Sequence, residues 1–356
     1  MKNSIQFVLG ALLVVLLYSC STNTDNKANQ SFYSFDAENS NNDYFDNSQI
    51  NELPLNEIYV GGEVLTEGVV DFSTLPLCSV LVKETELINM DTTFVGAYKY
   101  IGYSLHDILK PYTLNKKNAD HFKPNIDAYI EIENADGQCT YFSWGEVFFP
   151  NNRNHIIIAK AVMRIVPEKS KDQWPLPKTS KVVVVSDLIT GRNISNPVKI
   201  TVKSYPKLLD VKKGLKPLYS DNIKLYNENK LIETFIAIGA EKQQEAIHTI
   251  FYGKGRGIHS VHAHSGLYLK DLLATHFSSS QKSIQKGLFV IAAKDGYRGV
   301  FSYSEIMNRN DQAEVLFMCD AELKDKGIFR IIPSADFFSD RAIKGISEIW
   351  YSENEQ

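Results

Sequence analysis

The sequence predicts an α+β protein made of two tandem copies of a β-rich, mixed-sheet domain with short helices. Its 356 residues suffice for about two domains, and short runs of β-branched and aromatic residues dominate it. One motif, G-x-x-L-x-D-[IL]-L, occurs at 102–109 and 266–273. A second, D-G-x₃-[YV]-F-S-x-x-E, occurs at 136–146 and 295–305. The motifs keep their order and nearly their spacing, which indicates a duplicated domain.

The first nineteen residues resemble a signal peptide, with Lys2 followed by an apolar run over 7–17. That run is too short to span a membrane comfortably. It ends in Leu17-Tyr18-Ser19-Cys20, which resembles the bacterial lipoprotein signal. The resemblance implies that Cys20 becomes the acylated (palmitate-bearing) first residue of a lipid-anchored envelope protein of the outer membrane. The alternative is an ordinary secretory signal with a chance cysteine.

Residues 20–51 are expected to form a flexible acidic tether. Five acidic residues stand there against Lys27, and the segment lacks apolar periodicity. The formal net charge of −4 therefore lies mainly in this segment, and the rest of the chain is close to neutral. A near-neutral folded part has no basic face for nucleic acid, so we expect no nucleic-acid partner.

The folded part is expected to divide into a first copy at 52–207, a linker at 208–230 and a second copy at 231–356. Apolar and β-branched runs predict its strands. These runs are 57–60, 80–83, 128–133, 156–160, 182–185, 198–202, 232–238, 288–292, 315–318, 329–332 and 346–350.

The shared motifs have structural explanations. Each Asp-Gly pair lies between apolar runs and predicts a hairpin turn. Each Ser-x-x-Glu, at 143–146 and 302–305, predicts a capping box that opens a helix. The leucines at 105–109 and 269–273 have helical spacing and predict a helix with one buried face. A third, weaker similarity between the two copies is an arginine after an apolar run. Arg192 follows the run 182–185, and Arg341 follows the run 329–332.

These motifs together resemble the oxidoreductase molybdopterin-binding domain, the sulfite-oxidase type. An opening V-x-G-x-V strand matches 60–64, and both shared motifs follow in the family's order. The closing pattern of a strand ending in Pro, then Arg and a final strand, matches Pro333, Arg341 and 346–350. The resemblance covers about 55–205 and 230–351. It implies the family's fold and, in its enzymes, a molybdenum held by a Cys thiolate.

That thiolate is missing from the matching positions. The first copy has 79–84 without a Cys, Cys78 is out of register, and 235–240 in the second copy also lacks one. The resemblance therefore implies the fold without the reaction. We expect no cofactor, although the resemblance leaves molybdopterin open.

The main cluster of coordinating side chains is His259, His262 and His264. If the segment is a strand, His262 and His264 share a face. Such a pair suits a transition metal with a ligand from elsewhere. The alternative is a histidine-bearing rim that binds no metal.

Cysteine use does not indicate a disulfide framework. Beyond Cys20 there remain Cys78, Cys139 and Cys319, which permit at most one bridge. Neither a Walker loop, a G-x-S-x-G elbow nor H-E-x-x-H occurs. We therefore expect a membrane-tethered, non-catalytic accessory protein that binds a ligand or an envelope protein. The alternatives are a molybdopterin- or metal-dependent envelope oxidoreductase, and metal or haem capture through the three histidines.

Overall fold

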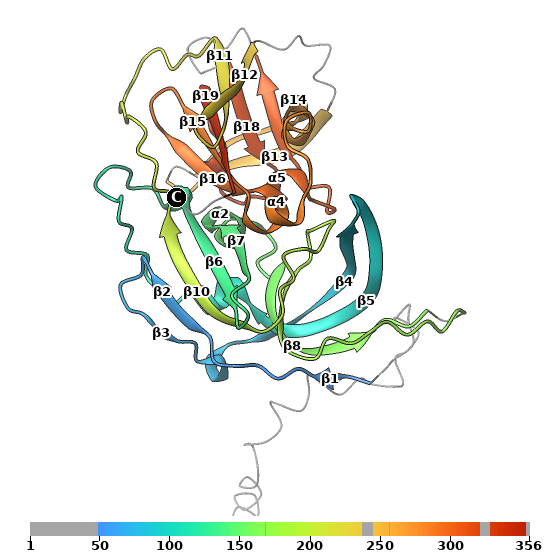
Figure 1. Cartoon of the computed structure of the whole chain (residues 1–356). Helices are drawn as coiled ribbons and strands as arrows, with labels where there is room; N and C mark the ends of the chain where they lie inside the picture. Colours follow the sequence, from blue (N-terminus) through green and yellow to red (C-terminus); the bar gives the residue numbers. More distant parts are fainter. Residues whose placement is uncertain (1–48, 168, 237–244, 256, 321–327, 354–356) are drawn as a thin grey trace, which may run out of the picture. The chain divides into compact units, whose positions relative to one another are not determined.

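The computed structural model describes residues 49–167, 169–236, 245–255, 257–320 and 328–353. These residues form four small sheets, arranged as in a four-bladed β-propeller (Figure 1), with 48% strand and 12% helix. The predicted α+β class with two tandem sulfite-oxidase-like copies is therefore wrong. The helices that the motifs predict are present but are one turn to a turn and a half long, too short to form a layer of their own.

Two sheets come from the earlier part of the chain. In one, the strand order is β1-β8-β5-β4, with β9 also paired to β8; in the other it is β3-β2-β10-β6-β7. The first contains β1 (Asn51–Glu52), β4 (Leu77–Ile88), β5 (Asp91–Ser104), β8 (Ile156–Arg164) and β9 (Lys181–Val184). The second contains β2 (Tyr59–Gly62), β3 (Gly68–Val69), β6 (Ala128–Asn134), β7 (Cys139–Ser143) and β10 (Pro197–Ser204).

The later part of the chain forms the other two, with orders β12-β11-β19-β15-β16 and β13-β14-β17-β18. The first contains β11 (Asn222–Asn227), β12 (Lys230–Ile236), β15 (Leu288–Ala293), β16 (Arg298–Ser302) and β19 (Ile346–Ser352). The second contains β13 (Glu245–Gly253), β14 (Gly257–Tyr268), β17 (Val315–Cys319) and β18 (Phe329–Pro333). Strand β11 lies inside the segment predicted to be a linker.

The pairing pattern of the earlier sheets recurs in the later ones. β10 pairs in parallel with β2 and antiparallel with β6. β19 likewise pairs in parallel with β11 and antiparallel with β15. Both Asp-Gly turns form as predicted, and Gly137 and Gly296 have φ values of 80° and 82°. Such values strain residues with a Cβ, which explains the glycine at both turns.

The described helices are short and lie mostly at the predicted motifs. They are α1 (Leu105–Leu109), α2 (Trp144–Phe148), α3 (Leu269–Leu273), α4 (Gln281–Lys286) and α5 (Tyr303–Met307). None of the helices in the described ranges is long and apolar enough to cross a membrane. The signal segment, Cys20 and nearly all of the predicted tether lie outside the described residues.

The hydrophobic cores draw on both parts of the chain. Tyr297 and Phe338, from the later part, pack against the core that contains Ile108 and Ile130. Leu87 and Ile189, from the earlier part, join the core of the later sheets. The described residues between 49 and 353 accordingly form one compact unit, which is the physical reason why a description as two separate tandem copies fails.

Candidate functional site

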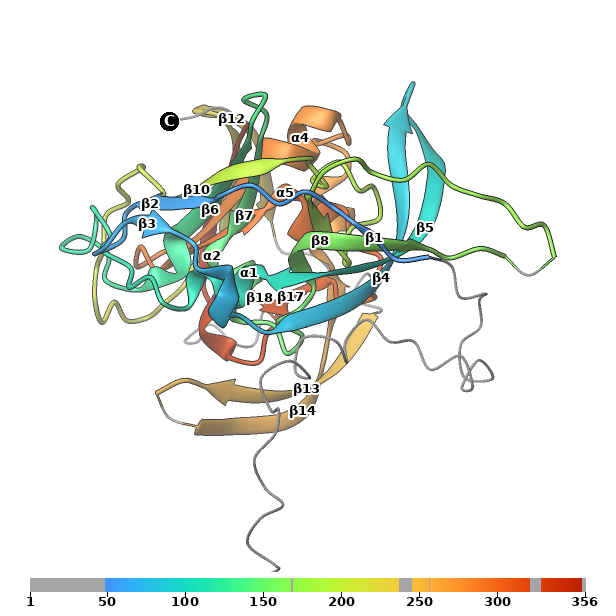
Figure 2. The same ribbon diagram turned by 90° about the horizontal axis from the view of Figure 1, so that it is seen from below.

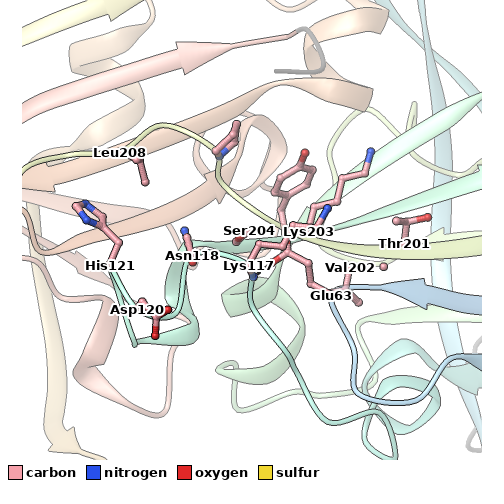
Figure 3. Close-up of a pocket in the computed structure, with 13 residues that line it drawn as sticks. Glu63, Lys117, Asn118, Asp120, His121, Thr201, Val202, Lys203, Ser204 and Leu208 are labelled. Atoms are coloured by element: carbon pink, nitrogen blue, oxygen red, sulfur yellow. Dashed lines mark hydrogen bonds between the residues drawn. The ribbon is translucent and has the colours of Figure 1, made fainter.

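A cavity of about 590 Å³ lies beside β10 and a turn in the segment after α1 (Figure 3). Strand β10 contributes the residues 201–204 and β2 contributes Gly62. The turn contributes Lys117, Asn118, Asp120 and His121. Tyr129, Pro206 and Leu208 complete an apolar part of the wall. The cavity therefore has polar groups on the turn and apolar groups on the strands and the segment after them.

Buried charges hold the turn in place. The carboxylate of Glu63 is buried and accepts a hydrogen bond from the backbone N–H of Lys117 at 2.8 Å. The Lys116 ammonium is buried, donates to the carbonyl of Phe122 at 2.7 Å and forms an ion pair with Asp127. Burial lowers the pKa of Lys116, and the nearby Asp127 opposes that shift. These interactions fix the backbone of the turn that lines the cavity.

Asn118 lines the cavity and has an unpaired acceptor atom. Its Nδ2 donates to Asp127 Oδ2 at 2.9 Å and to the carbonyl of Tyr205 at 3.3 Å. This pairing fixes the amide orientation, because a carboxylate and a carbonyl can only accept. The Oδ1 atom is buried and has no hydrogen-bond partner. An unpaired buried acceptor costs about 1–3 kcal/mol.

His121 adds a second acceptor. Its Nε2 lies 2.6 Å from the carbonyl oxygen of Leu209, which can only accept, so Nε2 carries a hydrogen. In the neutral ring, Nδ1 is then an acceptor. Figure 3 shows Asn118 and His121 on the same turn, with Lys203 on the facing strand. Lys203 is engaged by Glu131 at 2.9 Å.

The sequence motifs meet elsewhere, at a buried junction between the earlier and later parts of the chain. Arg192 is fully buried and binds two carboxylates, Glu146 at 2.6 Å and Asp187 at 2.7 Å. The hydroxyl of Ser302, from the later part, donates to Glu146 at 2.8 Å. Burial alone raises the pKa of Glu146, but the charge and hydrogen bonds of Arg192, the charge of His155 and the hydrogen bond from Ser302 together outweigh burial, so the pKa is lowered.

The same arrangement recurs with the roles of the two parts exchanged. Arg341 binds Glu305 at 2.5 Å and Asp336 at 2.6 Å. The hydroxyl of Ser143, from the earlier part, donates to Glu305 at 2.7 Å. Burial raises the pKa of Glu305 to about 7, against the charge of Arg341. These eight residues, which we call the junction network, are Ser143, Glu146, Asp187, Arg192, Ser302, Glu305, Asp336 and Arg341.

The capping prediction is confirmed in full at one site only. Ser302 and Glu305 form a complete capping box at the start of α5. Ser143 accepts from the N–H of Glu146, but the Glu146 carboxylate turns to Arg192 instead of reaching back. Because the junction network is buried and internally paired, it explains the shared motifs as structural elements and offers no group to a substrate.

No family model and no curated protein matches this sequence. The resemblance to molybdopterin-binding domains thus depends on the motifs alone, and the sheet arrangement contradicts the fold it implied.

The three predicted metal ligands lie on β14, and they do not come together as a site. His259 lines a separate cavity of about 340 Å³ with Lys254 and Asp340. His262 is exposed, whereas His264 is half-buried with its Nε2 unpaired. Burial lowers the pKa of His264, and the charges of Arg330 and His262 add to this. No group of three His, Cys, Asp or Glu in the described ranges can hold a metal ion, so the metal site stays a prediction.

Cys78, which is half-buried on β4, is a free thiol. Burial raises the pKa of Cys78 to about 11, which makes its thiol a poor nucleophile. The sequence analysis missed Asn118 and His121. Neither lies in a repeated motif, and polar residues in a turn are common, so no sequence signal separates them from ordinary loop residues.

Proposed function

We propose that the chain is a lipid-anchored binding protein of the bacterial envelope that holds a small hydroxyl-bearing ligand in the cavity beside Asn118. The observation that carries this proposal is a cavity of about 590 Å³ lined by Asn118, a residue whose buried Oδ1 has no hydrogen-bond partner. Ligand sites commonly have volumes of about 300–1,000 Å³ and a few oriented polar groups. The Leu17–Cys20 motif supports the lipid anchor.

The chemistry of the wall indicates the class of ligand. Asn118 Oδ1 and His121 Nδ1 are acceptors, so they need hydroxyl or amine donors. Tyr129 and Leu208 offer apolar surface on the other side. A sugar ring combines hydroxyl donors with apolar C–H faces and fits both. We therefore propose a mono- or disaccharide, held without a cofactor.

Calorimetric titration of the purified chain with a panel of mono- and disaccharides tests this proposal. We expect Asn118→Leu and His121→Phe each to weaken binding of the responsive sugar about tenfold or more, because each removes an acceptor. Circular dichroism checks that both variants remain folded.

The matched control is Asn222→Leu, in a neighbouring cavity of about 510 Å³ that shares Leu208 with the first cavity and is also lined by Trp350. This variant leaves Asn118 and His121 in place, so affinity should stay within about twofold of the unmodified chain. The proposal fails if no sugar binds, or if Asn222→Leu weakens binding as much as Asn118→Leu does.

A further inference from the structure

The hairpin of β13 and β14 presents an exposed apolar face. Ile250 pairs with Val261, and Tyr252 pairs with Ile258, so their side chains share one face. Ile250, Ile258 and Val261 are about three-fifths exposed, at 59%, 61% and 61%. Figure 2 shows the hairpin standing apart from the rest of the fold. Scattered exposed apolar residues are ordinary, but a contiguous group on a projecting element indicates a contact surface.

The base of the hairpin is held in position. The rings of Tyr252 and Phe337 lie 5.6 Å apart, and Tyr252 also contacts Phe338 at 6.2 Å. The N–H of Lys254 points to Asp340 at 3.4 Å. Phe337 is itself 48% exposed and extends the apolar surface. We call Ile250, Tyr252, Ile258, Val261 and Phe337 the hairpin face.

The hairpin starts with an acidic residue, Glu245 of β13, and its basic residues lie at the other end, between the two strands. Residues 246–268 contain neither Asp nor Glu, although the chain as a whole has 42 acidic residues against 38 Lys and Arg. Between β13 and β14 the sequence reads Gly253-Lys254-Gly255-Arg256-Gly257, so both charged residues of this stretch of sequence are cationic. An apolar face next to a basic stretch suits the headgroup region of an anionic bilayer. Apolar groups enter the acyl boundary there, and cations meet lipid phosphates.

We propose that the hairpin face docks onto an anionic membrane surface as a second contact beside the Cys20 anchor. The Cys20 anchor in this inference rests on the proposed function. The hairpin contact does not, because it needs neither acylation nor the cavity. Since the anchor keeps the chain near the bilayer, even a weak second contact is occupied at high effective concentration.

Vesicle flotation of the chain from Ser21 to Gln356, which lacks Cys20 and carries no acyl group, tests the inference. The vesicles contain phosphatidylcholine with or without phosphatidylglycerol. We expect binding to the anionic vesicles, and a loss of about tenfold or more in the double variant Ile250→Asp/Val261→Asp. Lys254→Glu/Arg256→Glu should weaken binding to anionic vesicles while leaving the weak binding to neutral ones unchanged.

The matched control is Leu81→Asp, because Leu81 is 55% exposed on β4, outside the hairpin face. It should bind vesicles as the unmodified chain does. The inference is overturned if that chain does not float, or if the double variant floats equally well. It is also overturned if sedimentation shows that the hairpin face instead forms a dimer of this chain. The assay contains no sugar, so a failure here leaves the cavity proposal untouched, and the reverse also holds.

Discussion

At the scale of single residues, Arg192 and Arg341 are buried cations, and each forms ion pairs with two carboxylates. Both are almost completely buried, at 0% and 1% exposed, and each faces two carboxylates. Desolvating a guanidinium is costly, so these residues persist only because their partners are placed around them. Removing an arginine would leave its two carboxylates buried without a counter-charge.

We therefore predict that Arg341→Met destabilises the chain by about 3–5 kcal/mol, the usual cost of breaking a buried pair. Urea unfolding followed by tryptophan fluorescence measures the change. Lys282→Met is the control, because Lys282 is exposed and pairs with the half-buried Glu353 at 3.7 Å, and it should cost less than about 1 kcal/mol. A comparable loss in both variants would refute the role given to burial.

Residue-level prediction from the sequence succeeded where a local rule decides the conformation. Ser302, Gly137 and Gly296 act through their own turn or helix start, and the sequence alone predicts that. The partners of Arg192 depend on long-range packing, since Glu146 and Ser302 are distant in the chain. Asn118 depends on it too, because its amide is oriented by Asp127 and Tyr205.

At the scale of elements, the long hairpins were the main surprise. The run 80–83 predicts only four of the twelve residues of β4, and no run predicts β5, β13 or β14. Strand β14 has His, Ser and Ala where a half-buried strand normally alternates apolar and polar residues. Ile258 and Val261, its apolar residues near the turn, are exposed. An alternation of apolar and polar residues predicts a strand only where one face is buried, so this signal is missing here.

The start of α5 offers a test at this scale. Ser302→Ala removes both the cap of α5 and the hydrogen bond to buried Glu146, so we predict a loss of about 3 kcal/mol. Ser280→Ala removes only the capping box of α4 and should cost about 1 kcal/mol. Thermal or urea unfolding compares the two. Equal losses would mean that the Ser302–Glu146 bond contributes little.

At the scale of the whole molecule, the repeated motifs predicted the wrong fold class. They correctly place α1, α2, α3 and α5, but each of these is only five residues long. The arrangement of the four sheets is set by packing between distant segments, such as Leu87 against the later core. A pattern of local motifs carries no information on that packing.

The junction network also predicts how global stability depends on pH. The pKa of Glu305 is raised from 4.5 to about 7 in the folded chain. Between these values the folded state binds a proton that the unfolded state releases, so this contribution is present at the acid end and is lost as the pH rises. Glu305→Gln abolishes it, while the other titrating groups remain in both proteins.

We expect the stability of the unmodified chain, relative to Glu305→Gln, to fall by about 3 kcal/mol from roughly pH 4.5 to pH 7. Urea midpoints measured across that range give the difference. Parallel pH profiles for the two proteins would show that Glu305 titrates normally in the fold.

The crossed bonds of the junction also bear on what happens when the backbone is cut. Lys212 and Lys213 lie in an exposed connection between β10 and β11, where trypsin can act. Each resulting fragment would contain a serine, Ser143 or Ser302, whose hydroxyl donates a hydrogen bond to a buried glutamate of the other fragment. A nicked protein should therefore stay associated as a non-covalent pair. Either fragment alone would expose its part of the hydrophobic cores. Its buried glutamate would also lose a hydrogen-bond donor. We therefore expect each fragment to fold only when it is bound to the other.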